Sequence, residues 1–345
     1  MKKSIALILA VAMIIACFGF VGCGDDKGGN DAGGQENQTL TLTVVVPAGF
    51  GDKSFNDSAH EGGEQIKADL GLNVKYIECK GEAHKQRMMD AAEGSDIVVA
   101  VGWEFYEITD VVGEYPEVKF IWIDNQVETP EDYPNLVNVI YAQNEGSYLA
   151  GYIAAAMSES GVVGAVGGDD ISTINDFIVG YKQGAEAFDS KTKVIQNYAG
   201  GDYENPAMGK ELALSINGLG ADVVFQVAGN TGSGVFEAAK ENKFYAIGVD
   251  KDQKTELPNY DEVILCSMKK EVGLSIYDLV KMYANDGVFE GGKVWLADMA
   301  NGYVDISYGS EDSVQLVSDE LKAKVEELKQ DIISGKIEVE TTRGY

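Results

Sequence analysis

The chain has 345 residues, of which 45% are hydrophobic, and this is enough to form two compact domains. It carries 56 acidic and 27 basic side chains, which gives a formal net charge of −29. A chain this acidic repels nucleic acid and anionic lipid headgroups, so we expect a small ligand that is neutral or cationic.

The N-terminal residues have the pattern of an export signal followed by a tether. Residues 1–22 combine two lysines with an apolar stretch, as signal peptides do. The run Phe20-Val21-Gly22-Cys23 resembles a bacterial lipoprotein signal, so we expect Cys23 to carry a lipid that anchors the protein at the extracytoplasmic face of the cell membrane. Residues 23–39 are rich in Gly, Asp and Asn and lack apolar periodicity, which is typical of a flexible tether.

From Leu40 onward, apolar β-type runs alternate with helical periodicity, which predicts parallel sheets covered by helices. The predicted strands are 42–46, 74–79, 97–101, 118–123, 136–141, 162–166, 194–198, 222–227, 244–249 and 263–267. The predicted helices are 54–70, 84–92, 104–114, 148–157, 174–188, 208–216, 235–241, 272–284 and 321–333, whereas 287–310 has no regular pattern. Two successive α/β sets of similar length predict two lobes with a cleft between them.

Polar and aromatic residues follow the predicted strands, at the edge where open parallel sheets bind ligands. They are Asp52, Phe55 and Asn56 in the first strand-to-helix loop, and then Trp103, Asp124, Phe225, Gly229, Asn230, Asp250 and Lys270. Aromatic side chains can stack on a flat ring, while carboxylates and a lysine can hydrogen-bond hydroxyl groups. A sugar joined to an aromatic base would satisfy both. Ser54, with Asp57 three residues later, predicts a capping-box helix start.

The other reactive residue types do not form a recognisable catalytic or metal pattern. Cys79 and Cys266 lie in apolar runs and are predicted to be core residues, and no Cys-x-x-Cys or Cys/His cluster is present, so we expect no metal and no cofactor. His60 and His84 lie in early helices and are predicted to be surface residues. A nucleoside hydrolase or phosphorylase would need an activated nucleophile or a phosphate clamp, and we find neither. A surface adhesin or sensor is a third class that the sequence leaves open.

The run Asp52-Lys53-Ser54-Phe55-Asn56 is similar to the opening motif of the basic membrane protein family. Members of this family are lipoprotein substrate-binding components of ABC transporters, and many are specific for purine nucleosides. The resemblance spans residues 40–340 and continues in the runs 145–151, 163–168, 180–184, 209–213, 225–239, 248–253, 267–270 and 333–337. It implies a type I periplasmic-binding-protein fold, an α/β fold with two Rossmann-like lobes hinged by three crossovers. We expect residues 40–142 and 268–290 to form one lobe, and residues 143–267 and 291–345 to form the other.

The resemblance also implies roles for individual residues. Phe55 and Phe225 are expected to sandwich a nucleobase, and Asp250 and Lys270 to contact the ribose, with Asp124, Trp103 and the Gly229 loop in the same cleft. The family commonly has an aspartate nine residues before the first phenylalanine, where this chain has Val46, so a different ring-bearing ligand stays open. The expected function is capture of a small ligand, most simply a nucleoside, and its delivery to an ABC permease.

Overall fold

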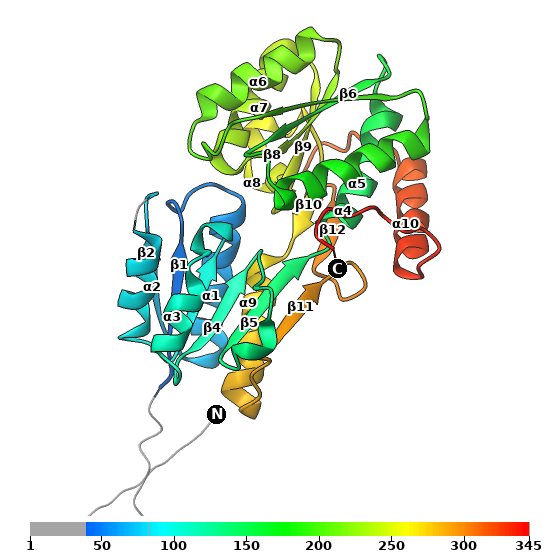
Figure 1. Cartoon of the computed structure of the whole chain (residues 1–345). Helices are drawn as coiled ribbons and strands as arrows, with labels where there is room; N and C mark the ends of the chain where they lie inside the picture. The colour runs from blue at the N-terminus through cyan, green and yellow to red at the C-terminus, as the bar shows by residue number, and fades with distance from the viewer. Residues whose placement is uncertain (1–38, 82, 345) are drawn as a thin grey trace, which may run out of the picture. The chain divides into compact units, whose positions relative to one another are not determined.

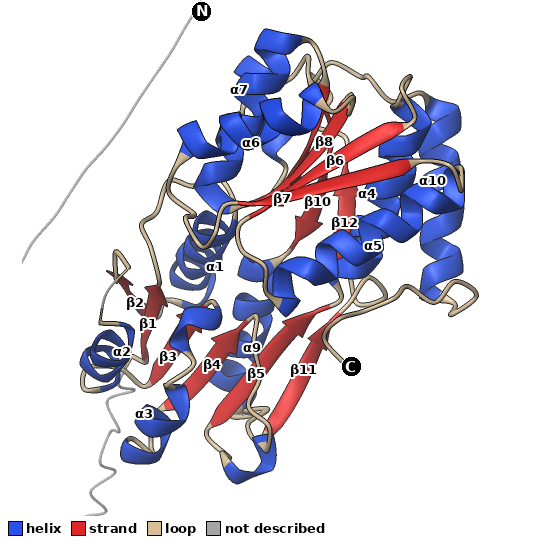
Figure 2. Cartoon of the chain, turned by 45° about the horizontal axis from the view of Figure 1, so that its top comes forward, coloured by secondary structure: helices blue, strands red, loops and turns tan. Residues whose placement is uncertain are grey.

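The computed structural model describes residues 39–81 and 83–344; the predicted signal peptide, Cys23 and nearly all of the predicted tether lie outside these residues. The described residues contain two six-stranded sheets with helices on both faces (Figures 1 and 2). The first sheet has the order β11-β5-β4-β3-β1-β2 and the second β12-β10-β9-β8-β6-β7. All strand pairs are parallel except β10 with β12. Within the described ranges, no helix is long and apolar enough to cross a membrane.

The first lobe is built around the first sheet. Its strands are β1 (Thr41–Val46), β2 (Asn73–Glu78), β3 (Ile97–Val101), β4 (Lys119–Ile123), β5 (Leu136–Tyr141) and β11 (Lys293–Ala297). Helices α1 (Phe55–Leu70) and α9 (Val272–Asp286) bury one face of the sheet, and α2 (His84–Ala92) and α3 (Ile108–Glu114) bury the other. Two short 3-10 helices complete the lobe: η1 (Trp103–Phe105) directly follows β3, and η2 (Pro130–Asp132) directly precedes β5.

The second lobe repeats this arrangement. Its strands are β6 (Val162–Gly167), β7 (Lys193–Tyr198), β8 (Val223–Val227), β9 (Tyr245–Asp250), β10 (Ile264–Lys270) and β12 (Val304–Ser307). One face is covered by α4 (Gln143–Met157), α5 (Ser172–Phe188) and α10 (Asp319–Ile333), and the other by α6 (Pro206–Gly218) and α7 (Ser233–Asn242). The shorter helices are η3 (Gly229–Gly232), α8 (Gln253–Glu256) and η4 (Pro258–Tyr260). Because the first five strands of each lobe share one order, β4 of the first lobe corresponds to β9 of the second.

The chain passes between the lobes three times, after β5, after β10 and between β11 and β12. The predicted division of the chain is wrong at two places. Strand β11 pairs with β5, so Lys293–Ala297 belongs to the first sheet and not to the second lobe. Residues 268–270 continue β10 and pair with β9 and β12 in the second sheet, so the first lobe resumes only after Lys270.

Glycines in the 180–184 run allow two helices of the second lobe to touch through their backbones. A Cβ atom on Gly180 would lie 2.1 Å from the carbonyl oxygen of Asn144, and one on Gly184 would lie 1.9 Å from that of Tyr148. Both distances are below any tolerable contact, so a larger residue at either position would push α5 away from α4. The close packing matters for function because α5 also carries residues of the cavity described below.

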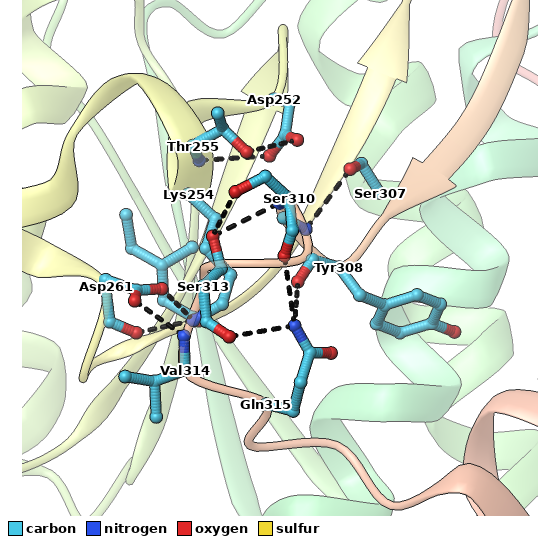
Figure 3. Close-up of polar contacts among 12 residues, drawn as sticks. Asp252, Lys254, Thr255, Asp261, Ser307, Tyr308, Ser310, Ser313, Val314 and Gln315 are labelled. Atoms are coloured by element: carbon cyan, nitrogen blue, oxygen red, sulfur yellow. Dashed lines mark hydrogen bonds and ion pairs between the residues drawn. The ribbon is translucent and has the colours of Figure 1, made fainter.

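A buried lysine fixes the loop that follows β9 (Figure 3). Lys254, only 1% exposed, donates to the backbone carbonyls of Asp261 and Ile264 and pairs with the Asp261 carboxylate at 2.6 Å. The same carboxylate accepts a hydrogen bond from the backbone N–H of Val314 at 2.6 Å. This network ties α8 to the segment after β12, and it thereby holds the end of β9, where Asp250 lies.

Candidate functional site

A cavity of about 680 Å³ lies between the two lobes, at the ends of their parallel strands. Its volume is in the range of small-molecule sites. Most of the predicted site residues line it: Asp52, Phe55, Asn56, Trp103, Asp124, Gly229, Asn230, Asp250 and Lys270. Sequence reasoning missed other lining residues, including Glu104, Asp169, Thr173, Phe177, Asp202, Tyr203 and Glu204.

Two predicted contacts do not lie in the cavity. Phe225 is fully buried within β8 and contacts Phe177 and Tyr181, with ring centroids 6.4 and 5.3 Å away. It belongs to the core beneath α4 and α5, because it lies in the middle of a strand whose sheet is covered on both faces. Val46 is likewise fully buried in the core of the first lobe. From the second lobe, the aromatic residues Phe177 on α5 and Tyr203 line the cavity.

Lys270 lies among the aromatic rings of the cavity. Its Nζ atom is 5.0 Å from the centroid of the Phe55 ring in the first lobe and 5.2 Å from that of Phe177 in the second. It is also 4.8 Å from the Tyr141 ring and donates to Asp124 Oδ2 at 2.6 Å. Two aromatic rings from different lobes therefore flank one buried ammonium group, a geometry that suits a flat ring bound beside a polar substituent.

Asp124 and Asp250 occupy corresponding positions in the two lobes. Asp124 follows β4 and Asp250 ends β9, and both have a left-handed backbone, with φ of 72° and 63°. Few residues other than glycine adopt this conformation, and such strain gathers at functional sites. Burial raises the pKa of Asp250, against the opposing effects of Lys270 and of a hydrogen bond from Ser54. The repeated fold thus directs one carboxylate from each lobe into the shared cavity.

Asp52 lines the cavity and also binds the backbone at the start of α1. Its carboxylate accepts hydrogen bonds from the backbone N–H groups of Ser54, Asn56 and Asp57, at 2.9 to 3.0 Å. The predicted capping by Ser54 is wrong, because the Ser54 hydroxyl instead donates to Asp250 of the other lobe. Burial raises the pKa of Asp52 to about 6, although the three backbone bonds act in the opposite direction.

The Trp103 and Glu104 pair comes from η1, at the end of β3. Burial raises the pKa of the Glu104 carboxyl to about 7, with a smaller contribution from the charge of Asp124. Tyr203 lines the same cavity from the second lobe, and its ring lies directly on Gly168, where a Cβ atom would be 2.0 Å from the ring. Gly168 of the 163–168 run is therefore needed for Tyr203 to reach the cavity.

The prediction that His84 is a surface residue is wrong. His84 begins α2, lines the cavity and packs on Phe105 with ring centroids 5.3 Å apart. His60 does not line the cavity; its ring packs between Phe50 and Tyr76, at 5.0 and 4.5 Å. The prediction for Cys79 and Cys266 is confirmed, since both are buried free thiols.

Several lining residues present polar atoms that are buried and have no hydrogen-bond partner among the described residues. These atoms are Asn56 Oδ1, His84 Nε2, Trp103 Nε1 and Asp124 Oδ1, of which Asp124 Oδ1 forms an ion pair with Arg343 at 3.6 Å. An unpaired buried polar group costs about 1–3 kcal/mol, and a ligand that pairs with it recovers part of that cost. Across residues 39–81 and 83–344, no group of three His, Cys, Asp or Glu residues could hold a metal ion.

The two lobes are joined across the cavity by polar contacts. Besides Ser54 with Asp250, the Gln253 side chain donates to the Lys53 carbonyl at 3.0 Å. Lys251 pairs with Glu61 of α1 at 2.5 Å. These bonds link α1 and the two residues before it in the first lobe to the end of β9 and the residues that follow it in the second, so the lobes are closed over the cavity.

Two Rossmann-like lobes with three crossovers and a cavity between their strand ends define a type I periplasmic-binding-protein fold, the fold of proteins that close on small ligands. A solute-binding protein of an ABC transporter system from Aeropyrum pernix K1 has the same fold, with a TM-score of 0.77 and 26% identity over 88% of this chain and 93% of that chain.

The family follows from sequence comparison. Residues 39–343 match the family described as ABC transporter substrate-binding protein PnrA-like, and the chain belongs to this family. It is 30% identical to the ABC transporter nucleoside-binding protein BmpA of Lactococcus lactis subsp. cremoris, over 98% of this chain and 99% of that protein. It is 32% identical to basic membrane protein D of Borreliella burgdorferi, over 85% of this chain and 82% of that protein.

Proposed function

We propose that the protein is an extracytoplasmic, lipid-anchored binding protein that captures a nucleoside between its lobes and delivers it to an ABC permease. The observation that carries this proposal is the arrangement around Lys270. Phe55 and Phe177, whose rings lie 5.0 and 5.2 Å from Lys270 Nζ, would stack on a base in this proposal, and Asp124 and Asp250 would accept hydrogen bonds from ribose hydroxyls. The relative that is named a nucleoside-binding protein supports the same ligand class.

The charge of the cavity favours a nucleoside over a nucleotide. Its lining contains seven carboxylates: Asp52, Glu104, Asp124, Asp169, Asp202, Glu204 and Asp250. The lysines of the lining are Lys80 and Lys270, and Lys270 is already paired with Asp124. A phosphate group would bring up to two further negative charges into this field and would be repelled.

The proposed role is binding without chemical change. Stacking rings and carboxylates hold a ligand, and the ammonium of Lys270 is engaged with Asp124. Release would follow when the contacts between Lys251 and Glu61 and between Ser54 and Asp250 break as the lobes open.

Mass spectrometry of the small molecules released by denaturing the purified protein tests the ligand class. We expect one or more intact nucleosides, present in proportion to the protein. Release of a different ring-bearing compound would retain the binding role and reject the nucleoside. Formation of free base and ribose, or of ribose phosphate, during incubation with a nucleoside would instead identify an enzyme.

A further inference from the structure

The segment 338–343, which we call the C-terminal strap, lies along α5 of the second lobe. Its hydrogen bonds to this lobe involve both backbone and side chains: Gln183 with Glu338 and Glu340, Asn144 with Val339 and Glu340, and Asp176 with Thr341 and Thr342. Thr342 also donates to the carbonyl of Ser172 at 2.7 Å. These hydrogen bonds fix the position of residues 338–342, and therefore also that of the last residue of the strap.

That residue is Arg343, and its side chain leaves the second lobe. One guanidinium nitrogen, Nη2, donates to the backbone carbonyl of Asp124 at 3.0 Å. The other, Nη1, donates to Thr173 Oγ1 on α5 and lies 3.6 Å from Asp124 Oδ1. The Arg343 side chain is 5% exposed. A single buried guanidinium therefore bridges the N-terminal turn of α5 and the end of β4, which belong to different lobes.

The residue that Arg343 holds is one of the two strand-end aspartates. Asp124 has the strained φ of 72°, and the bond from Arg343 to its carbonyl stabilises that backbone conformation. The Asp124 carboxylate lies between two cations, Lys270 at 2.6 Å and Arg343 at 3.6 Å. The charge of Asp124 also acts on the buried carboxyl of Asp250, so removing Arg343 would take away one of the two cations that offset the buried negative charge here.

We propose that Arg343 is a positioning residue of the ligand site, which orients Asp124 and holds the two lobes in the closed arrangement without touching the ligand. Arg343 does not line the cavity. The effect on affinity rests on the proposed function, since it requires a ligand in that cavity, whereas the effect on the lobes does not. A guanidinium suits this task because its planar donors can bond Thr173 and Asp124 at the same time, which a lysine ammonium on a flexible stem does less well.

The expected loss of affinity depends on the fraction of ligand-free protein molecules whose lobes are closed. If the loss of Arg343 lowers the fraction of ligand-free protein in the binding-competent arrangement to about one tenth, the apparent affinity falls about tenfold. Arg343→Met should therefore weaken binding of the best nucleoside by about tenfold or more, mainly through faster dissociation. The nucleoside affinity of Arg343→Lys should lie between that of Arg343→Met and that of the unaltered protein.

Lys336→Met is the matched control, because it removes the same charge from a nearby position where the side chain is 71% exposed and pairs with Asp331 on the surface.

Spin labels at Tyr106→Cys and Leu219→Cys, two exposed positions in different lobes, report the distance between the lobes by pulsed electron paramagnetic resonance. The labelled chain also carries Cys17→Ser and Cys23→Ser, while Cys79 and Cys266 are buried and escape labelling.

In the ligand-free protein we expect Arg343→Met to broaden and lengthen the distance distribution, and Lys336→Met to leave it unchanged. An unchanged distribution in Arg343→Met would overturn the proposal, whether or not a nucleoside binds. If the unaltered protein binds no nucleoside, the proposed function fails while the distance measurement still decides the role of Arg343. A loss of affinity that merely follows a loss of melting temperature, with unchanged distances, would make Arg343 a stabilising residue only.

Discussion

Exchanging Phe177 for leucine tests which aromatic side chain of the second lobe stacks on the ligand. Phe177 lines the cavity, and its ring lies 5.2 Å from Lys270 Nζ, an atom that is 5.0 Å from the Phe55 ring. Leucine keeps an apolar side chain of similar size in the core but removes the flat face. We therefore expect the main consequence to be a loss of ligand affinity.

The magnitude follows from the loss of one stacked face. Stacking of a base on an aromatic side chain contributes about 1–3 kcal/mol. At 1.4 kcal/mol for each factor of ten, Phe177→Leu should weaken binding by about 5- to 150-fold. The control is Phe225→Leu, which makes the same chemical change in the adjoining core, behind Phe177. It should destabilise the fold by about 1–3 kcal/mol, as a large-to-small core substitution does, and leave affinity within about twofold, because Phe225 does not reach the cavity.

Isothermal titration calorimetry on both variants gives the affinities, and urea unfolding gives the stabilities. The comparison is informative because the resemblance to the family assigns stacking to Phe225, whereas the structure brings Phe177 to the cavity. If Phe225→Leu lost affinity and Phe177→Leu kept it, at equal fold integrity, the assignment from the structure would be refuted.

Four further predictions concern single side chains. Lys270→Met leaves the buried Asp124 without its closest cation, so we expect at least a tenfold loss of nucleoside affinity by calorimetry; retained affinity would remove Lys270 from the site. Burial raises the pKa of Glu104 from 4.5 to about 7, so the folded state loses stability as pH rises through this window. Glu104→Gln should therefore raise the melting temperature at pH 8 relative to the unaltered protein and change it little at pH 5, and equal shifts at both pH values would contradict this. Lys254→Met leaves buried acceptors unpaired and should lower the free energy of unfolding, measured in urea, by about 3–5 kcal/mol. A decrease of less than about 1 kcal/mol would refute this prediction. Cys23→Ala should release the protein from the membrane fraction; if this variant stays anchored while Cys17→Ala releases the protein, the assignment of the lipid to Cys23 is wrong.

The parts of the fold that could be predicted from sequence are those with a continuous apolar signal. Strand β3 lies at the predicted residues 97–101 because both faces of its sheet are buried and every side chain in it is apolar. Strands β11 and β12 were missed because they are edge strands with exposed or partly exposed side chains, so neither has a continuous buried run. The misplaced lobe boundary at residues 291–345 follows directly from the missed β11.

The limits at the site have a similar physical origin. Asp124 and Asp250 could be assigned from sequence to the cavity lining because the ends of parallel strands meet at one edge, and their contact with a ligand stays a prediction. Phe225 was misplaced because a residue in the middle of a strand faces a covering helix and not the edge. Phe177 carries no sequence signal of its own, since it lies on an apolar face of α5 like an ordinary core residue. Arg343 is far from the cavity residues in sequence, and only the folded strap brings it to Asp124.

The most direct test of the central claim is a calorimetric titration of the full chain, freed of bound ligand, with nucleosides and with their 5′-monophosphates. A flat base between Phe55 and Phe177 and an uncharged ribose against Asp124 and Asp250 predict saturable binding of at least one nucleoside. The matching 5′-monophosphate should bind at least about tenfold more weakly, because the lining is acidic. Absence of binding by every nucleoside tested, or equal affinity for the monophosphates, would contradict the account.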